Sequence, residues 1–298
     1  MGASTGRAGG MFTRFAAHAV VWRNSARRGF ARQLSCLSAS TSTAPAKTHE
    51  TLTLAPDNRV VLIGDVHGCR AELDLLLDKI SIRKTDTVVF VGDLVNKGPD
   101  SVGVLRTLRE LRHRAFAVRG NHDEAALSQW LRWRSSGKQP SKKWRWVEAL
   151  TEDDVHLLKS LPYTLAIPTL GMIVVHAGFV PDVTLEDQRL EDMIKMRNCI
   201  RKRKERGVEK LKAMESIAEG DPWASLYSGE LGFVVFGHDA RRGLQMAPHA
   251  LGLDTGCVYG GELTACVIEA GEGARGEGEP PGTLVSVRAL EVYEEPKS

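Results

Sequence analysis

Five short polar motifs in this chain each follow directly on an apolar run. One of them places Asp93 after the run TVVFV (87–91), within the stretch GDLVNKGPDS. The other four begin at Asp65, Asn121, His176 and His238 and read DVHG, NHD, HAG and HD. Packing alone explains them poorly, because buried polar groups are costly unless something pairs them. Carboxylate, amide and imidazole groups without thiolate suit manganese, iron, zinc or magnesium ions. The pattern therefore predicts a centre that holds two metal ions.

A two-metal centre of this kind predicts chemistry on phosphate. Two carboxylates beside a neutral amide leave the site net positive once two divalent ions bind. Ions about 3.5 to 4 Å apart hold phosphoryl oxygens and lower the pKa of a bridging water from about 15.7 toward about 7, which gives a hydroxide for in-line attack. The sequence offers no Ser or Cys in a recognisable nucleophile elbow. We therefore expect hydrolysis without a covalent intermediate.

Alternating strands and helices must position these motifs. The first part of the chain predicts strands at 60–63, 87–91 and 115–118, and helices at 70–80, from Pro99-Asp100-Ser101 onward, and near 124–134. Such alternation indicates a parallel sheet, and ligands of such sheets lie at the carboxyl ends of the strands. Later strands at 163–167, 172–175, 233–236, 264–269 and 284–290 have hairpin spacing, which predicts a second sheet, mixed or antiparallel. The fold class expected is α/β, a sandwich of two mixed sheets flanked by helices.

Two segments lie outside this pattern. Residues 135–160 predict a helical interlude, in which Trp144 and Trp146 are expected to anchor the core rather than to bind a ligand. Residues 195–212 predict a charged helix with nine basic side chains against two acids. This run is either a solvated helix face or a surface that overhangs the metal centre and attracts a polyanionic substrate.

Composition narrows the possible functions. The chain has 298 residues, 42% of them hydrophobic, and no apolar run of 18 residues, so no membrane span is expected. The net charge is +3, but residues 1–49 hold six Arg, one Lys and no acid, which leaves −4 on the rest. A mildly acidic body predicts no general nucleic-acid binding. The five cysteines are scattered, without C-x-x-C spacing, and favour a reducing compartment over a disulfide framework.

The basic, acid-free residues 1–49 read as a transit peptide and linker before a domain at 50–298. The stretch 11–32 could form an amphipathic face of aromatic and arginine side chains, as mitochondrial import signals do. Mitochondrial localisation is expected, with a plastid or, for a simple basic tail, the cytoplasm as alternatives.

The motifs together resemble a known family. GDVHG (64–68), GDLVNKG (92–98), RGNHD (119–123), HAG (176–178) and GHD (237–239) are similar to the metal-site motifs of calcineurin-like metallophosphoesterases in the phosphoprotein phosphatase superfamily. NKGPDS, HAGFVPD, FGHDA and LDTGCVYGGELTA resemble its ApaH-like branch, related to bacterial diadenosine tetraphosphatases. The resemblance covers about residues 58–270 and implies the metallophosphoesterase β-sandwich.

The resemblance also implies roles for individual residues. It places Asp65, His67 and Asp93 on the first metal, and Asp93, Asn121, His176 and His238 on the second, with Asp93 bridging. His122 resembles the general acid that protonates the leaving oxygen. Lys97, Arg119, Asn121 and Arg197 would contact phosphate, and the less favoured alternative for Lys97 and Arg119 is a role at the protein surface. Manganese is the metal expected, with iron, zinc, cobalt or magnesium as alternatives. Taken singly, these residues could also be turn-forming acids and amides or core histidines.

Two departures from the phosphoprotein phosphatase pattern bear on the substrate. Asn96 stands where those enzymes have Asp, so the group expected to pair with His122 is a neutral amide instead of a carboxylate. Lys97 stands where they have Arg, so a single ammonium charge replaces a guanidinium that can bind two oxygens at once. Both changes favour phosphoanhydrides, whose phosphate leaving group hardly needs a proton, over phosphoserine. We expect hydrolysis of a dinucleoside polyphosphate, a capped nucleotide or inorganic polyphosphate. The alternatives are a protein serine/threonine phosphatase and a catalytically silent metal-binding scaffold.

Overall fold

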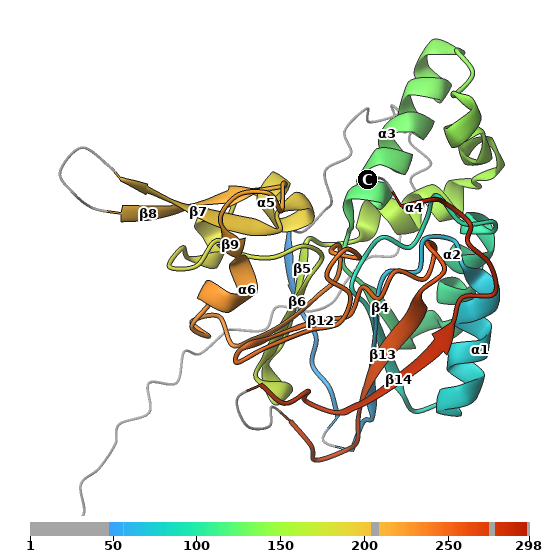
Figure 1. The fold of residues 1–298 in the computed structure, drawn as a ribbon. Helices are drawn as coiled ribbons and strands as arrows, with labels where there is room; N and C mark the ends of the chain where they lie inside the picture. The colour runs from blue at the N-terminus through green and yellow to red at the C-terminus, as the bar shows by residue number, and fades with distance from the viewer. Residues whose placement is uncertain (1–47, 56, 204–208, 274–277, 297–298) are drawn as a thin grey trace, which may run out of the picture. The chain divides into compact units, whose positions relative to one another are not determined.

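Two facing β-sheets form the body of the protein in the computed structural model (Figure 1), which describes residues 48–55, 57–203, 209–273 and 278–296. The predicted transit peptide falls almost wholly on residues 1–47, outside the described residues. Among the helices of the described ranges, none has the length and apolar character that crossing a bilayer requires.

The first sheet holds the strands that end in the Asp65, Asp93 and Asn121 motifs. Its order is β14-β13-β2-β3-β4, with β2 at Val60–Ile63, β3 at Thr87–Phe90, β4 at Ala115–Ala117, β13 at Glu262–Ile268 and β14 at Thr283–Arg288. The three strands β2, β3 and β4 are parallel, as predicted. The expectation that the strands near 264–269 and 284–290 belong to the second sheet is wrong. Strand β13 pairs antiparallel with β2, because the wholly buried β2 needs hydrogen-bond partners on both sides.

The second sheet holds the strands that end in the His176 and His238 motifs. Its order is β1-β5-β6-β10-β12-β11, with β1 at His49–Thr51, β5 at Thr164–Ile167, β6 at Met172–Val175, β10 at Phe233–Phe236, β11 at Gln245–Ala247 and β12 at Ala250–Gly252. Strands β5 and β6 form the predicted hairpin, whereas β6, β10 and β12 are parallel. The sheet is therefore mixed, and three of its strands end at the same edge.

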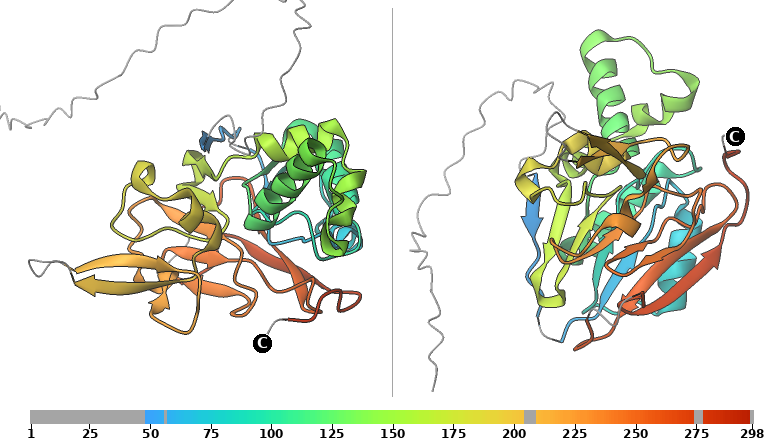
Figure 2. Two further views of the ribbon diagram at one scale, coloured as in Figure 1. Left: turned by 90° about the horizontal axis from the view of Figure 1, so that it is seen from above. Right: turned by 60° about the vertical axis from the view of Figure 1, so that its left-hand side comes forward.

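Strand periodicity divides the core into layers. In β2, Val60 and Leu62 pack between the two sheets, while Val61 and Ile63 pack against helices on the outer face. Those helices are α1 (Arg70–Ile80), α2 (Ser101–Leu111), α3 (Asn121–Ser136) and α4 (Glu152–Ser160), which Figure 2 shows on one side of the first sheet. Short 3-10 turns lie at η1 (Arg112–Arg114), η2 (Lys142–Ala149), η3 (Pro168–Leu170) and η4 (Leu185–Asp187).

The outer face of the second sheet is covered by a smaller layer. It consists of α5 (Leu190–Lys195), α6 (Trp223–Leu226) and a third sheet of order β8-β7-β9, with β7 at Asn198–Arg203, β8 at Glu209–Met214 and β9 at Asp221–Pro222. The helix predicted over 195–212 is therefore wrong, because β7 and β8 form an antiparallel hairpin (Figure 1). Leu211 and Ala213 pack on the core and alternate with Lys210 and Lys212, which is the period of a strand.

Candidate metal centre

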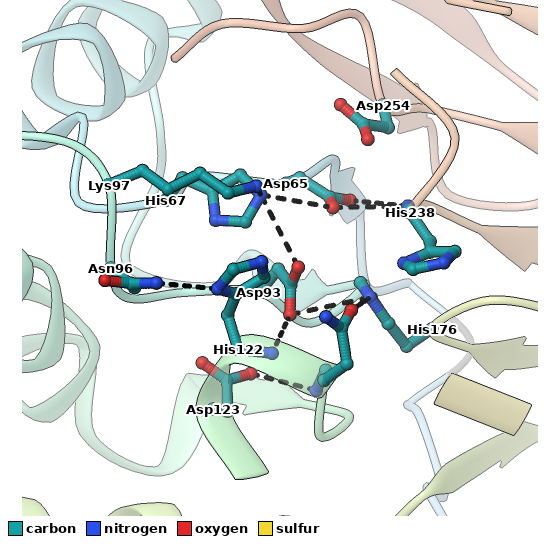
Figure 3. A network of polar contacts seen from close by, with 12 residues as sticks. Asp65, His67, Asp93, Asn96, Lys97, His122, Asp123, His176, His238 and Asp254 are labelled. Carbon is teal, nitrogen blue, oxygen red and sulfur yellow. Dashed lines mark hydrogen bonds and ion pairs between the residues drawn. The ribbon is translucent and has the colours of Figure 1, made fainter. Parts of the chain in front are cut away.

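The loops that follow β2, β3, β4, β6 and β10 meet at one edge of the sandwich (Figure 3). Asp93 lies in the middle, almost completely buried. Its Oδ2 is 3.4 Å from His67 Nε2, and its Oδ1 is 3.5 Å from His176 Nε2. Asn121 Oδ1 lies 3.1 Å from the same His176 nitrogen. The structure thus brings residues from both sheets to one carboxylate, as the motif pattern predicted.

The backbone at this edge is held in an unusual conformation. Among the described residues, seven other than glycine have a positive φ, and five of them belong to these loops: His67, Asp93, Asn96, Lys97 and His238. Such a conformation costs about 1 to 3 kcal/mol per residue and persists where the surroundings impose it. Its concentration here indicates that the loops are shaped for the positions of their side chains.

Two glycines leave room for the buried carboxylates. A Cβ on Gly120 would run into the carboxylate of Asp93, and a Cβ on Gly237 would run into that of Asp65. The side chains therefore lie directly against the backbone of the neighbouring loops. His122 N also donates to Asp93 Oδ1 at 2.8 Å, from the first turn of α3.

The three central histidines are oriented as metal ligands. His67 and His176 use Nδ1 to contact the carbonyls of Val95 (3.4 Å) and Val91 (2.9 Å), which leaves Nε2 facing Asp93. His238 is reversed, because its Nε2 contacts the Lys195 carbonyl at 2.9 Å. Burial lowers the pKa of all three rings, so each is neutral. A neutral ring fixed by a carbonyl on one nitrogen offers its lone pair on the other.

The carboxylates complete the donor set. Burial, followed by the charges of Asp254 and Asp93, raises the pKa of Asp65 well above its ordinary value. A cation at the same place would relieve that repulsion. One ligand atom each from Asp93, His176 and His238 lies within 4.8 Å of the others, and the same holds for His67, Asp93 and His122. The residues present therefore fit two divalent cations that share Asp93.

Asp254 is a site residue that the motif pattern did not single out. It is 5% exposed, lines the same pocket, and accepts the Gly256 N–H at 3.1 Å. Burial raises its pKa to about 6. The signal was present in the sequence, because Asp254 follows the apolar residues of β12 just as the five identified motifs follow their strands.

His122 faces the same centre beside two tryptophans. Its Nδ1 is 2.7 Å from Asn96 Nδ2, and burial lowers its pKa to about 4. The Trp144 ring stacks at 6.5 Å from the His122 ring, and Trp146 Nε1 donates to Asn96 Oδ1 at 3.4 Å. Both tryptophans are only half-buried, packed at the edge of the core. The expectation that they serve only as core anchors missed their contacts with the site.

Two of the three predicted phosphate-binding cations line the pocket. Lys97 Nζ is 2.9 Å from His67 Nε2 and 5.0 Å from the ring centre of Tyr259. Arg197 donates to the carbonyls of His238 (3.0 Å) and Glu215 (3.2 Å). Its Nε is 3.5 Å from Asp239 Oδ1, so a buried carboxylate helps to orient it.

Arg119 is not brought to the pocket. Its side chain is fully buried and donates to Glu124 Oε2 at 2.9 Å and to the carbonyls of Leu158 (2.9 Å) and Lys159 (2.8 Å). These contacts tie the start of α3 to the end of α4. The Arg119 guanidinium therefore holds two helices together and, contrary to the prediction, does not line the pocket where phosphate would bind.

A pocket of about 720 Å³ opens over the centre. Its wall carries both signs of charge: the cations Lys97, Lys143, Arg197 and Arg241, and the acids Asp93, Glu215, Asp254 and Glu294. Of the described residues in and around the β7–β8 hairpin, those that reach this wall are Arg197, just before β7, and residues 215–217, just after β8. Lys143 is paired with Glu294, so Lys97 and Arg197, together with metal ions held by the ligand cluster, are the charges that would suit an extended phosphate chain.

Comparison with known proteins gives consistent matches. Residues 58–242 match the family model of the calcineurin-like phosphoesterases. The symmetrical bis(5'-nucleosyl)-tetraphosphatase of Janthinobacterium sp. (strain Marseille) is 32% identical over 255 residues, covering 68% of this chain and 90% of the relative. The asymmetrical bis(5'-nucleosyl)-tetraphosphatase PrpE of Oceanobacillus iheyensis is 27% identical over 242 residues, covering 70% and 87%.

Solved structures agree with these matches. A crystal structure assigned as that of a diadenosine tetraphosphatase is 39% identical, with a TM-score of 0.68 over 82% of this chain and 99% of that one. A protein serine/threonine phosphatase from Saccharomyces cerevisiae has a TM-score of 0.54 at 18% identity, over 85% of this chain and 86% of the other. The second likeness is one of fold alone.

Proposed function

The chain belongs to the calcineurin-like phosphoesterase family, and on that premise we propose that it hydrolyses phosphoanhydride bonds in dinucleoside polyphosphates. The observation that carries the proposal is the position of Asp93, buried between His67 and His176 at the meeting point of both sheets. The tetraphosphatase names of its matched relatives support the anhydride over the phosphoprotein.

The donor set assigns ligands to two divalent ions. Asp65, His67 and Asp93 would hold one ion, and Asp93, Asn121, His176 and His238 the other. We propose manganese, with iron, zinc, cobalt or magnesium as alternatives, because oxygen and imidazole ligands suit all of them. When bound, such a pair neutralises phosphate charge and activates water for attack on phosphorus.

The chain's own residues bind and orient the substrate. Lys97 and Arg197 line the pocket beside the ligands and are placed to hold phosphate oxygens on either side of Asp93. The Asp239 carboxylate keeps the Arg197 side chain extended toward the pocket. His122 lines the same pocket, with its ring 4.9 Å from that of His67, and would donate a hydrogen bond to the leaving oxygen.

Diadenosine tetraphosphate is the substrate we propose first. A capped nucleotide and inorganic polyphosphate share its anhydride chain and are the next candidates. A phosphoprotein is disfavoured because the likeness to a protein phosphatase is confined to the fold, at 18% identity.

Side-by-side turnover tests the proposal. The full chain with Mn²⁺ is assayed on diadenosine tetraphosphate, inorganic polyphosphate, cap analogue and a phosphoserine peptide, with EDTA-treated protein as the control. We expect kcat/KM to be highest for an anhydride and lost with EDTA. Faster turnover of the phosphopeptide, or undiminished turnover in EDTA, would overturn the proposal.

A further inference from the structure

Asn96 is the only described side chain recorded in a hydrogen bond to the ring of His122, and its amide could face that ring in two ways. Its side chain is 1% exposed, and its backbone N–H donates to Ser101 Oγ at 2.8 Å, so the residue has one fixed position. If the amide oxygen faced the ring, Nδ1 would have to donate. If the NH₂ group faced the ring, Nδ1 would have to accept.

Trp146 decides between the two orientations. An indole N–H can only donate. Because Trp146 Nε1 points at the Asn96 side chain with a contact of 3.4 Å to Oδ1, the amide oxygen belongs on the Trp146 side. The NH₂ group then faces His122, which agrees with the 2.7 Å separation between Asn96 Nδ2 and His122 Nδ1. Trp146 stands in η2, which also places Trp144 against the His122 ring.

A ring that accepts at Nδ1 carries its proton on Nε2. Figure 3 shows the second ring nitrogen of His122 on the side of Asp93 and Lys97, toward the substrate pocket. We propose that Trp146 is a positioning residue, which acts through Asn96 to hold His122 as the Nε2–H tautomer and thereby selects phosphate over alkoxide leaving groups. This inference rests on the proposed phosphoanhydride hydrolysis.

The chemistry of the two leaving groups explains the selection. In anhydride hydrolysis, water adds to phosphorus, the bond to the bridging oxygen breaks, and the water protons pass to solvent or to the product phosphates. The departing phosphate is stable as an anion, with a second pKa of about 6, and needs only the Nε2–H hydrogen bond. A departing alkoxide needs a whole proton. His122 could give that proton only by becoming an imidazolate, because the Asn96 NH₂ group leaves no room for a second proton on Nδ1.

The first test reads the tautomer directly. Long-range ¹H–¹⁵N spectra of histidine-labelled enzyme are recorded in the zinc-loaded, diamagnetic form, with His122→Gln to assign the ring. We expect Nδ1 of His122 to be unprotonated and Nε2 protonated in the natural chain. Asn96→Asp should move a proton to Nδ1, and Trp146→Phe, which removes the N–H but keeps a ring, should give a mixture. A protonated Nδ1 in the natural chain would overturn the proposal.

The second test reads the leaving-group preference. The ratio of kcat on a phosphoserine peptide, whose leaving group is an alkoxide, to kcat on diadenosine tetraphosphate should rise about 10²-fold in Asn96→Asp, within the range for general acid catalysis, and severalfold in Trp146→Phe. Trp133→Phe is the matched control, because Trp133 packs at the core edge from α3. Unchanged tautomer and ratio in Trp146→Phe would contradict the role of Trp146. Failure of the natural chain to cleave any anhydride would instead refute the proposed function, while the spectra still decide the tautomer.

Discussion

Arg119 and Arg197 each stand beside a metal-site motif, yet their surroundings differ. Arg119 is enclosed between α3 and α4 with three hydrogen-bond acceptors, whereas Arg197 is 26% exposed and lines the pocket. Arg119 is therefore placed to stabilise the fold, whereas Arg197 is the arginine for which we propose contact with the substrate.

Replacing Arg119 by Met should lower stability and leave substrate affinity unchanged. The change removes the Arg119 hydrogen bonds to two carbonyls and to Glu124, which is 23% exposed and keeps its hydrogen bond from the Tyr163 hydroxyl. Buried acceptors left without a donor cost about 1 to 3 kcal/mol. Arg197→Met should instead raise KM for diadenosine tetraphosphate about tenfold or more, with a change in unfolding free energy below about 1 kcal/mol. Urea unfolding and steady-state kinetics on both variants check this. A raised KM in folded Arg119→Met would return Arg119 to the binding site.

The buried carboxyls predict how metal-free protein responds to pH. Burial, with Asp93 next, raises the pKa of Asp123 to about 8, and the pKa of Asp65 is also raised. At a pH between the ordinary pKa of such a carboxyl and its raised pKa, the folded state binds more protons than the unfolded state. The free energy of unfolding therefore falls as pH rises, by up to about 1.4 kcal/mol per pH unit for each group. The histidines, whose pKa values are lowered, act oppositely but only below about pH 6.5.

The consequence is measurable as a thermal shift. Between pH 6.5 and 8, EDTA-treated protein should lose stability. Added Mn²⁺ should raise Tm more at pH 8 than at pH 6.5, because a cation beside the buried carboxyls replaces the stabilisation that is lost as their protons leave. Equal Mn²⁺ shifts at both pH values would contradict this linkage between metal binding and the protonation of the buried carboxyls.

At the scale of elements, the turns that follow the strands and carry the ligands contain glycines at which an added Cβ would clash with neighbouring atoms. Gly237, just after β10, lies against both the Asp65 carboxylate and the Val91 side chain of the facing loop. Gly237→Ala should therefore displace Asp65 and weaken Mn²⁺ binding about tenfold or more. Gly273→Ala is the control, because a Cβ there meets nothing within 4 Å. The Mn²⁺ affinity of both variants is measured by calorimetric titration. An affinity in Gly237→Ala equal to that of the natural chain would contradict the packing argument.

The strand ends could be predicted because their signal is local. An apolar run that stops at an Asp, Asn or His is readable at Asp65 or His176 from a few residues. The pairing of β13 with β2 was not readable, because their contacts join residues about 200 positions apart. Nor was the burial of Arg119, which depends on α4 packing beside α3. The sequence did not predict the β7–β8 hairpin, because its many charged residues obscured the strand-like alternation in which Leu211 and Ala213 face the core.

At the scale of the whole molecule, the charge of the chain is divided unevenly. Residues 1–49 carry +7 and the rest −4. We propose that this segment directs import into mitochondria, because a basic, acid-free amphipathic stretch suits that route. A reporter fused after residue 50 should enter mitochondria, and one in which the six arginines are changed to glutamine should not. A diffuse cytosolic signal from the first fusion would reduce the segment to a basic tail.

We propose above all that one buried carboxylate, that of Asp93, serves two metal ions that act on an anhydride. It is tested most directly by counting Mn²⁺ bound per chain while following diadenosine tetraphosphate hydrolysis, in the natural protein and in Asp93→Asn. The natural chain should bind two ions and gain activity as the second binds. Asp93→Asn should stay folded, lose the second ion and fall to background on every substrate. Two bound ions and retained turnover in Asp93→Asn would contradict the account.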